Sequence, residues 1–132
     1  MKLDIDPHKV QKGPKRKILV VDDDSDVAFT YKVGLESNGF VVDVYNDPLI
    51  ALSNFKAGVY DLLILDIRMP NMNGFELYKK MKSIDYKAKV CLVTAFANIE
   101  FKKAFIPEVK CFIRKPIAIA SLVRRVKAIT GP

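Results

Sequence analysis

Short apolar runs alternate with longer segments of helical periodicity from residue 17 onward. The short runs have the length of β-strands, and apolar residues three and four positions apart predict amphipathic helices. Strands are predicted at residues 18–21, 40–45, 62–65, 90–93 and 110–113. Helices are predicted at residues 25–38, 48–57, 75–84, 98–105 and 117–129. Such alternation predicts an α/β domain, a five-stranded parallel sheet with five helices covering its two faces.

The composition is that of one folded domain. The chain has 132 residues, of which 50% are hydrophobic and 28% are charged. This length is typical of a single domain, and it is long enough to bury a core without stabilising crosslinks or metals. We therefore expect one globular domain over residues 17–132.

Charge is concentrated at the N-terminus. Residues 1–17 carry six Lys or Arg and two Asp, so they hold +4 of the net charge of +7. We expect residues 1–16 to form a basic, flexible tail, which is either a solvated terminus or a segment that contacts nucleic acid or anionic membrane. The solvated terminus is favoured. Neither a signal peptide nor an apolar run of the ~20 residues that span a membrane is found, which predicts a cytoplasmic protein without a membrane partner.

The two cysteines, Cys91 and Cys111, each lie in an apolar run. Cysteines in such runs usually act as small hydrophobic residues, and a reducing cytosol disfavours disulfides. Two buried thiols are therefore expected in preference to a disulfide. With a single histidine in the chain, the residues that a zinc-type site would need are lacking.

Polar side chains follow four of the five predicted strands. In an open parallel sheet, binding sites form at the carboxyl ends of the strands. With strand order 2-1-3-4-5, the first and third strands flank the switch point, where their carboxylates would converge. Any one of these residues is explained by a turn, a cap or a solvated surface position, whereas all of them together favour a functional site. The residues are Asp22 and Asp23 after the first strand, Asp66 after the third, Thr94 after the fourth and Lys115 after the fifth.

This set of residue types suits phosphoryl transfer to a carboxylate. Clustered Asp oxygens without Cys or His select a hard cation, for which Mg²⁺ is the best candidate and Mn²⁺ a substitute. The cation would keep Asp66 ionised, and an ionised carboxylate attacks phosphorus to give an aspartyl-phosphate. Lys115 and the cation would offset charge on the transferring group, and the Thr94 hydroxyl would bind one of its oxygens.

Four segments carry a resemblance to a known family: ILVVDDD, LLILDIRMPNMNG, VTA and CFIRKP. In this order and spacing they resemble the receiver domains of bacterial and archaeal response regulators, over about residues 17–129. The resemblance implies a flavodoxin-like, doubly wound sheet like that of the chemotaxis response regulator. It also implies a phosphorylation-activated switch of a two-component system. Such domains are signalling proteins and not enzymes in the usual sense, although they catalyse their own Mg²⁺-dependent phosphorylation and slow autodephosphorylation.

The resemblance assigns roles to the residues that match its motifs. Asp66 is similar to the phosphoacceptor and Lys115 to the lysine of the family, which Pro116 follows in what is commonly a cis peptide bond. Thr94 resembles the switch hydroxyl and Phe112 the switch aromatic, although a static core residue also explains Phe112. The implied metal ligands are Asp22, Asp23, Asp66 and the backbone carbonyl of Arg68.

Two positions depart from the commonest family patterns. Arg68 lies two residues after Asp66, and Phe96 lies two residues after Thr94. In the family these positions border the path of the attacking water, so a guanidinium and a large ring there would shield the phosphoryl group. We therefore hypothesise slow autodephosphorylation. A solvated loop side chain is an equal explanation for Arg68.

The family's partners are expected partners here. They are a sensor histidine kinase, a phosphotransfer protein or a small phosphodonor, followed by an effector or output domain. The output surface would comprise the helix at 98–105, the strand at 110–113 and the helix at 117–129. An acidic partner or simple solvation explains its basic side chains, and homodimerisation on phosphorylation stays open. These side chains belong to Lys102, Lys103, Arg124, Arg125 and Lys127.

Three other functions fit the sequence less well. A pseudo-receiver that binds without phosphorylation is disfavoured by the complete set of site residues. A phosphatase with an Asp nucleophile would need a second acid/base Asp soon after it, and residue 68 is Arg. Direct DNA binding has only the basic tail in its favour, with no room for a helix-turn-helix after Ile129.

Overall fold

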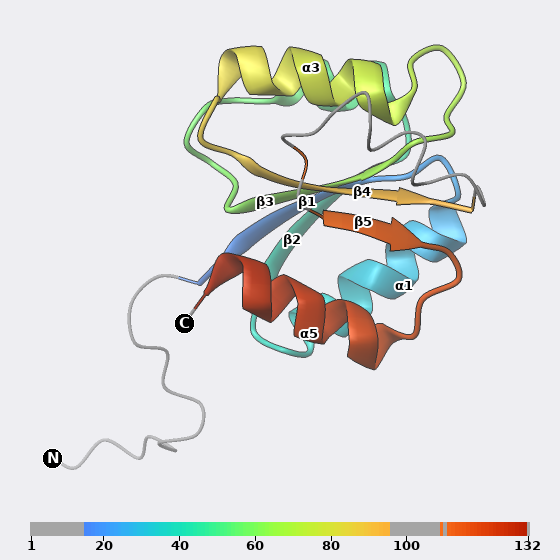
Figure 1. The fold of residues 1–132 in the computed structure, drawn as a ribbon, viewed down its shortest axis with the longest axis vertical. Helices are drawn as coiled ribbons and strands as arrows, with labels where there is room; N and C mark the ends of the chain where they lie inside the picture. Colours follow the sequence, from blue (N-terminus) through green and yellow to red (C-terminus); the bar gives the residue numbers. More distant parts are fainter. Residues whose placement is uncertain (1–14, 96–108, 110, 132) are drawn as a thin grey trace, which may run out of the picture.

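The structure, a computed structural model, describes residues 15–95, 109 and 111–131. Within these residues the chain forms a five-stranded, all-parallel sheet of order β2-β1-β3-β4-β5 with helices on both faces (Figure 1). The strands are β1 (Lys17–Val21), β2 (Val41–Tyr45), β3 (Leu62–Asp66), β4 (Lys89–Thr94) and β5 (Cys111–Arg114). The helices of the described part are α1 (Ser25–Glu36), α2 (Pro48–Asn54), α3 (Gly74–Ile84) and α5 (Ile119–Thr130).

The predicted α/β class and strand order are confirmed, and the element bounds differ by a few residues. The predicted helix at 98–105 lies outside the described residues, as does most of the predicted N-terminal tail. The last helix begins at Ile119 instead of residue 117, because Pro116 and the residues beside it turn the chain after β5. Within the described ranges, no helix combines the length and apolar character needed to cross a membrane.

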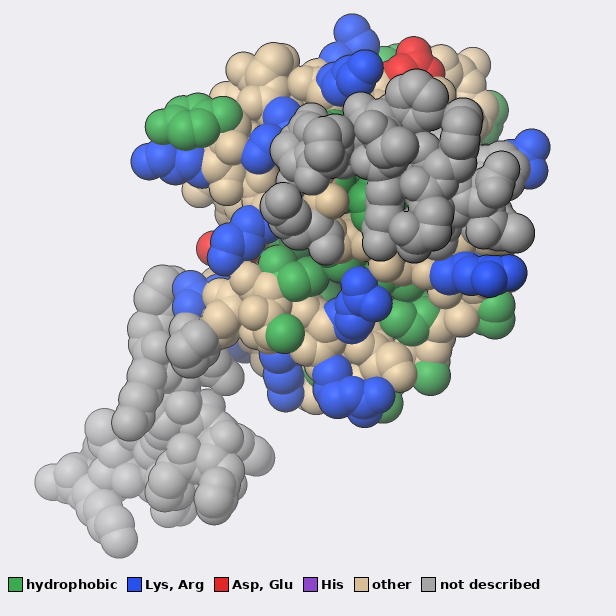
Figure 2. Space-filling view, in the orientation of Figure 1, with side chains coloured by type: hydrophobic (Ala, Val, Ile, Leu, Met, Phe, Trp, Pro, Cys, Tyr) green, Lys and Arg blue, Asp and Glu red, His purple; other side chains and the backbone are tan. Residues whose placement is uncertain are grey.

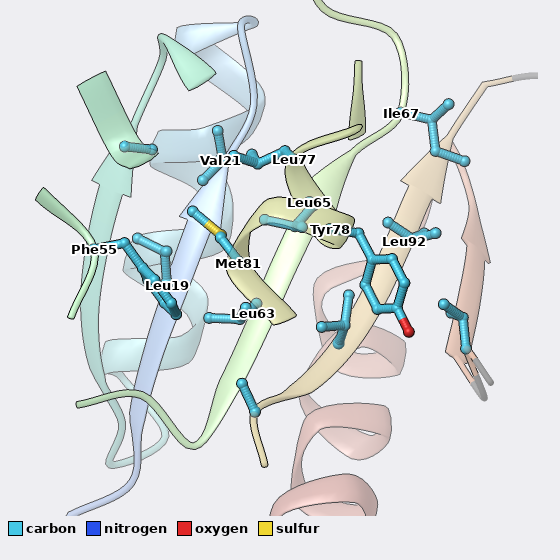
Figure 3. Packing of buried hydrophobic residues seen from close by; sticks show 14 of the residues in the cluster. Leu19, Val21, Phe55, Leu63, Leu65, Ile67, Leu77, Tyr78, Met81 and Leu92 are labelled. Carbon is cyan, nitrogen blue, oxygen red and sulfur yellow. The ribbon is translucent and has the colours of Figure 1, made fainter. Parts of the chain in front are cut away.

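Two apolar layers hold the sheet between its helices. On one face, Leu19, Leu63 and Leu92 of the sheet belong to one buried cluster with Leu77 and Met81 of α3 (Figure 3). The other face packs against α1 and α5, which lie together below the sheet in Figure 1. Full burial of each Leu contributes roughly 1.5–3 kcal/mol of hydrophobic stabilisation. Because β3 is buried along its whole length, its last residue, Asp66, is fixed in a rigid central strand.

The two cysteines form a disulfide, so the prediction of two buried thiols is wrong. Cys91 of β4 and Cys111 of β5 are register partners on adjacent strands, with Cα atoms 4.5 Å apart. Both side chains belong to the apolar layer on the α1 and α5 side of the sheet. The parallel register therefore places the two sulfurs on one face within bridging distance. An argument from the redox compartment alone contains no information about this register.

Side-chain caps fix the start of the helices that follow the functional strands. Oδ1 of Asp24 accepts hydrogen bonds from the amides of Asp26 and Val27, which sets the first turn of α1. Asn73 and Glu76 form a reciprocal capping box at the start of α3. The loops that leave β1 and β3 are thus closed by defined helix N-termini, which restricts the positions of Asp22 and Asp66.

Candidate functional site

Three aspartates meet at the carboxyl edge of the central strands. Asp22 and Asp23 follow β1, and Asp66 ends β3, its hydrogen-bonded neighbour in the sheet. One carboxylate oxygen from each of the three lies within 4.8 Å of the others. Asp22 and Asp66 are buried, at 1% and 5% exposure, and Asp23 is exposed. The sequence prediction that these carboxylates converge is met by the geometry.

Lys115 joins this acidic cluster from the end of β5, an edge strand of the sheet. Its Nζ lies 2.8 Å from Oδ2 of Asp22 and 3.5 Å from Oδ1 of Asp66. Its amide donates to the carbonyl of Thr94 at 2.8 Å, and the Lys115–Pro116 peptide bond is cis. The turn after β5 therefore directs the ammonium across the end of β4 to the carboxylates of β1 and β3.

The acidic cluster perturbs the pKa values of its own members. Burial, with the charge of Asp22 added to it, raises the pKa of Asp66 to about 7, against an ordinary value of 3.8. The positive charge of Lys115 opposes this rise, and the hydrogen bond and charge of Asp23 reinforce it. Burial alone would lower the pKa of Lys115, but close contact with Asp22 and the charge of Asp66 raise it above 10.5. Lys115 is thus a permanent cation, whereas Asp66 needs more positive charge nearby to be fully ionised at neutral pH.

Asp22 is held firmly with one oxygen available. Its backbone amide donates to the carbonyl of Tyr45 at 3.1 Å, and Asn46 donates to its carbonyl at 2.8 Å. Oδ1 accepts the amide of Asp24 at 3.0 Å. Oδ2 is buried and accepts no well-directed hydrogen bond from the described residues, although the Lys115 ammonium lies beside it. Buried carboxylate oxygens gathered in one cluster, with a single ammonium beside them, fit a hard divalent cation.

Of the remaining predicted site residues, Thr94 lies at the same edge and Phe112 just beneath it. The register pairs Asp66 with Val93, which puts the buried Thr94 one position further along the edge. Phe112 is buried in the core below, where its carbonyl accepts a hydrogen bond from Arg125 at 3.1 Å. Arg68 is exposed in the loop after β3. Phe96, Lys102 and Lys103 lie outside the described residues.

Gly74 is a site residue that the sequence reasoning missed. A Cβ atom at this position would overlap the carbonyl oxygen of Asp66 and come within 2.8 Å of the Cα of Ile67. The amide of Gly74 donates to the carbonyl of Ile67 at 2.8 Å. The first turn of α3 is therefore packed directly on the backbone of Asp66, which only glycine permits. A glycine placed immediately after the helix-capping Asn73 was the available signal.

Tyr31 is a second residue that the sequence reasoning did not assign to the site. It is 4% exposed on α1, and it lines a pocket of about 280 Å³ together with Lys115 and Pro116. Burial raises the pKa of its hydroxyl, while the charge of Lys115 acts in the opposite direction. Its aromatic ring thus forms part of the wall on the Lys115 side of the site. Nothing in the helical periodicity of α1 distinguishes this position from other buried positions.

A parallel sheet of order 2-1-3-4-5 with polar residues at its carboxyl edge defines the class of flavodoxin-like α/β domains. The family model for "Response regulator receiver domain" matches residues 18–127. This chain therefore belongs to the response regulator receiver domain family.

Individual relatives agree with this assignment. The chain is 34% identical over 114 residues to the transcriptional regulatory protein PrrA of Mycobacterium leprae, covering 86% of this chain and 49% of that protein. It is similar to the non-phosphorylated HemR receiver domain of Leptospira biflexa, with a TM-score of 0.81, 27% identity and coverage of 89% and 96% of the two chains. The chain spans about half the length of the curated relatives described.

A structure of the response regulator TrrA from Thermotoga maritima in complex with Mg²⁺–BeF is also similar. The TM-score is 0.77, the identity is 30%, and 86% of this chain and 98% of that chain are covered. This chain is thus similar in fold to a response regulator solved in complex with Mg²⁺–BeF, and its own three aspartates could hold a metal ion.

Proposed function

We propose that this domain is a switch in which Asp66 accepts a phosphoryl group and thereby changes the domain's partner-binding surface. The observation that carries the proposal is the placement of three carboxylates within 4.8 Å, with the Lys115 ammonium 3.5 Å from Asp66. Four groups from the ends of β1, β3 and β5 meet there, and two of them are buried carboxylates. A solvated surface cluster would not bury Asp22 and Asp66 in this way.

Asp22, Asp23, Asp66 and the backbone carbonyl of Arg68 are the residues that would hold a divalent cation. Mg²⁺ suits carboxylate and carbonyl oxygens, and Mn²⁺ would be a substitute. When bound, the cation supplies positive charge that keeps Asp66 ionised and offsets charge on the phosphoryl oxygens. The donor set supports this assignment because one carboxylate oxygen from each of the three aspartates lies within 4.8 Å of the others.

The chain's own groups account for the transfer step. An ionised oxygen of Asp66 forms a bond to phosphorus, the bond from phosphorus to the donor breaks, and the donor group leaves with the electron pair. Lys115, whose charge is permanent, is placed to stabilise the negative charge of the phosphoryl oxygens. Thr94, at the end of the neighbouring strand, would donate its hydroxyl to another of these oxygens. Attack by water on phosphorus would later release phosphate and regenerate Asp66.

The charge on Asp66 then acts on the adjoining elements. A phosphoryl group adds nearly two negative charges and three acceptors, and it favours the conformation that directs Thr94 and Lys115 toward it. The carbonyl of Thr94 accepts a hydrogen bond from the amide of Lys115. Phe112 lies in β5, the strand that leads into the turn carrying Lys115. Coupling of this kind is typically 1–3 kcal/mol. The surface that changes would be the predicted helix at 98–105 together with β5 and α5.

The partners follow from this surface and from the family. A sensor histidine kinase or phosphotransfer protein, or a small phosphodonor, would supply the phosphoryl group, and an effector or output domain would read the surface. In Figure 2, Lys and Arg side chains outnumber acidic ones on the face that carries α5, where Arg124, Arg125 and Lys127 are exposed. This charge favours an acidic partner. The receiver unit would comprise residues 17–132, with residues 1–16 as a basic extension.

Mass spectrometry after incubation with acetyl phosphate and Mg²⁺ tests the proposal. We expect one phosphoryl adduct on the wild type, none on Asp66→Asn, and none when EDTA removes the cation. Asp61→Asn is the matched control, because Asp61 lies just before the opposite end of β3 and bonds the amide of Lys17. An adduct on Asp66→Asn, or none on the wild type, would refute the proposal.

A further inference from the structure

One cysteine of the Cys91–Cys111 disulfide lines a cavity at the edge of the sheet. Cys111 begins β5, the last strand in the sheet order, and it lines a pocket of about 340 Å³. Cys111 is 6% exposed and Cys91 is 1% exposed, and Cys91 is absent from the lining of that pocket. The two residues therefore differ in exposure, and Cys111 is the one at the pocket. A reagent that enters the pocket meets Cys111 first.

Arg125 lies beside the accessible sulfur. From α5, its Nη2 is 3.5 Å from Sγ of Cys111 and 3.1 Å from the carbonyl oxygen of Phe112. The bond to the carbonyl fixes the guanidinium, so its charge stays next to the sulfur. Cysteine reacts as the thiolate, and a neighbouring guanidinium stabilises that form. The structure therefore provides one of the two cysteines with an activating group.

The pocket itself is basic. Lys82, Lys87 and Lys89 line it together with Cys111. Lys82 donates to the carbonyls of Tyr86 and Ala88, which anchors its ammonium at the pocket wall. Positive walls raise the local concentration of anions. An attacking thiolate is an anion, so the pocket favours the reagent that thiol exchange requires.

We propose that the Cys91–Cys111 disulfide is a thiol-exchange site, opened by a dithiol reductant and closed by a small disulfide, with Cys111 as the sulfur that exchanges. In the opening direction, a thiolate of the dithiol bonds to Sγ of Cys111, and Cys91 leaves with the electron pair and takes up a proton. The second thiol of the dithiol gives up its proton and attacks its own mixed disulfide. Cys111 leaves as a thiolate beside Arg125. The disulfide gains two electrons and the dithiol loses two.

The position of the crosslink allows the redox state of the disulfide to regulate the phosphorylation switch, an inference that rests on the function proposed above. Three positions beyond the cysteines along β4 and β5, Thr94 and Arg114 are register partners, and Lys115 follows. The disulfide restrains β5 from moving relative to β4. Opening it therefore loosens the two strands that carry Thr94 and Lys115, and the response of the surface to a charge on Asp66 changes with it.

Alkylation followed by mass spectrometry of the full, folded chain tests the exchange. Dithiothreitol serves as the dithiol, and the protein is quenched with iodoacetamide at successive times. We expect two alkylated cysteines to appear under native conditions, with any trapped mixed disulfide on Cys111, because Cys91 is the first thiol released. Arg125→Gln should slow the opening roughly three- to tenfold, because the thiolate loses its neighbouring charge. The matched control is Arg124→Gln, since Arg124 bonds Ser121 and should leave the rate unchanged.

A variant on the opposite edge of the sheet tests whether the disulfide is reduced only in unfolded molecules. Val42 is 2% exposed on β2, so Val42→Ala should raise the unfolded population without altering the pocket. If Val42→Ala accelerates reduction in proportion to its measured loss of stability, the disulfide opens only on unfolding and the proposal is wrong. Equal rates for Arg125→Gln and Arg124→Gln, or a mixed disulfide trapped on Cys91, would overturn it as well.

Phosphate uptake by oxidised and reduced samples separates this proposal from the proposed function. With acetyl phosphate and Mg²⁺, we expect the two samples to differ at least twofold in the amount of adduct at Asp66. An equal adduct in both would overturn the regulatory meaning. No adduct in either would refute the proposed function, whereas the alkylation rates would still decide whether the exchange site exists.

Discussion

The Lys115 ammonium lies 2.8 Å from Oδ2 of Asp22, and this ion pair is largely withdrawn from water. Only 17% of the Lys115 side chain and 2% of the Asp22 side chain are exposed. Removing one partner of such a pair leaves a buried charge without compensation. We expect Lys115→Met to lower the free energy of unfolding by roughly 2–4 kcal/mol in EDTA. Urea denaturation with and without Mg²⁺ checks this, and Mg²⁺ should restore part of the loss.

An exposed ion pair supplies the control for this prediction. Lys17 lies 3.5 Å from Asp43, with side-chain exposures of 37% and 40%. Solvent screens such pairs, so Lys17→Met should cost less than about 1 kcal/mol. Equal losses for Lys115→Met and Lys17→Met, or a loss at Lys115 that Mg²⁺ leaves untouched, would contradict the account of the acidic cluster.

The raised pKa of Asp66 predicts how the stability of the cation-free protein depends on pH. The pKa of Asp66 is about 7 in the folded protein, against 3.8 for an unperturbed carboxyl group such as that of the unfolded chain. At a pH between these two values, the folded state retains a proton that the unfolded chain has released. Between these values the free energy of unfolding falls as pH rises. The stability contributed by the retained proton is fully present below about pH 4 and is lost as the pH rises through about 7. Asp66→Asn removes it. The Tm of wild type and Asp66→Asn, measured in EDTA from pH 4.5 to 8, should diverge in favour of the variant as pH rises.

Two comparisons make the pH prediction specific. Asp61→Asn keeps Asp66 and should follow the wild-type curve. A divalent cation competes with the proton on Asp66, so Mg²⁺ should stabilise the wild type more at pH 8 than at pH 5.5. Parallel curves for wild type and Asp66→Asn would show that Asp66 titrates in its ordinary range.

Much of the sheet and of its carboxyl edge follows from the sequence. The apolar runs before Asp22, Asp66 and Thr94 predict parallel strands, and a parallel sheet brings the ends of its strands to one edge. Convergence of the carboxylates requires only the strand order, without detailed packing. Asp23, exposed at the same edge, follows from its place next to Asp22.

Features that depend on packing or on strand register could not be predicted from the sequence. The contact of Gly74 with the backbone of Asp66 depends on how closely α3 approaches β3. The pairing of Cys91 with Cys111 depends on the register of β4 and β5, which apolar patterns do not determine. Tyr31 reaches the wall of the site through the rotation of α1, and its position in the helical repeat is that of a core residue.

The glycine contact predicts a specific defect. In Gly74→Ala the new Cβ meets backbone atoms of Asp66 and Ile67, so α3 or the end of β3 has to shift. We expect a loss of roughly 1–3 kcal/mol in unfolding free energy, as for other overpacked positions, together with slower phosphorylation of Asp66. Urea denaturation and the acetyl phosphate reaction measure the two effects.

Gly58→Ala separates a loss of stability from a defect in the site. Gly58 has a φ of +79° and open space around its Cβ position, so alanine there costs about 1 kcal/mol through the backbone alone. Its phosphorylation rate should stay at the wild-type value. If Gly74→Ala phosphorylates as fast as Gly58→Ala, the packing of α3 does not position Asp66.

The last prediction concerns Arg68 and the lifetime of an aspartyl-phosphate at Asp66, which we expect this side chain to lengthen. It is exposed two residues after Asp66, where a guanidinium would shield phosphorus from an attacking water. We expect Arg68→Asn to shorten the half-life roughly fivefold, equivalent to about 1 kcal/mol in the barrier to hydrolysis. Phe96→Ala, at a position outside the described residues, should act in the same direction. The decay of the phosphorylated species by mass spectrometry measures both, and Arg124→Asn, which alters a distant exposed arginine, should decay as the wild type does. Half-lives that stay unchanged in Arg68→Asn and Phe96→Ala would remove the shielding hypothesis and leave Arg68 as a solvated side chain of the loop after β3.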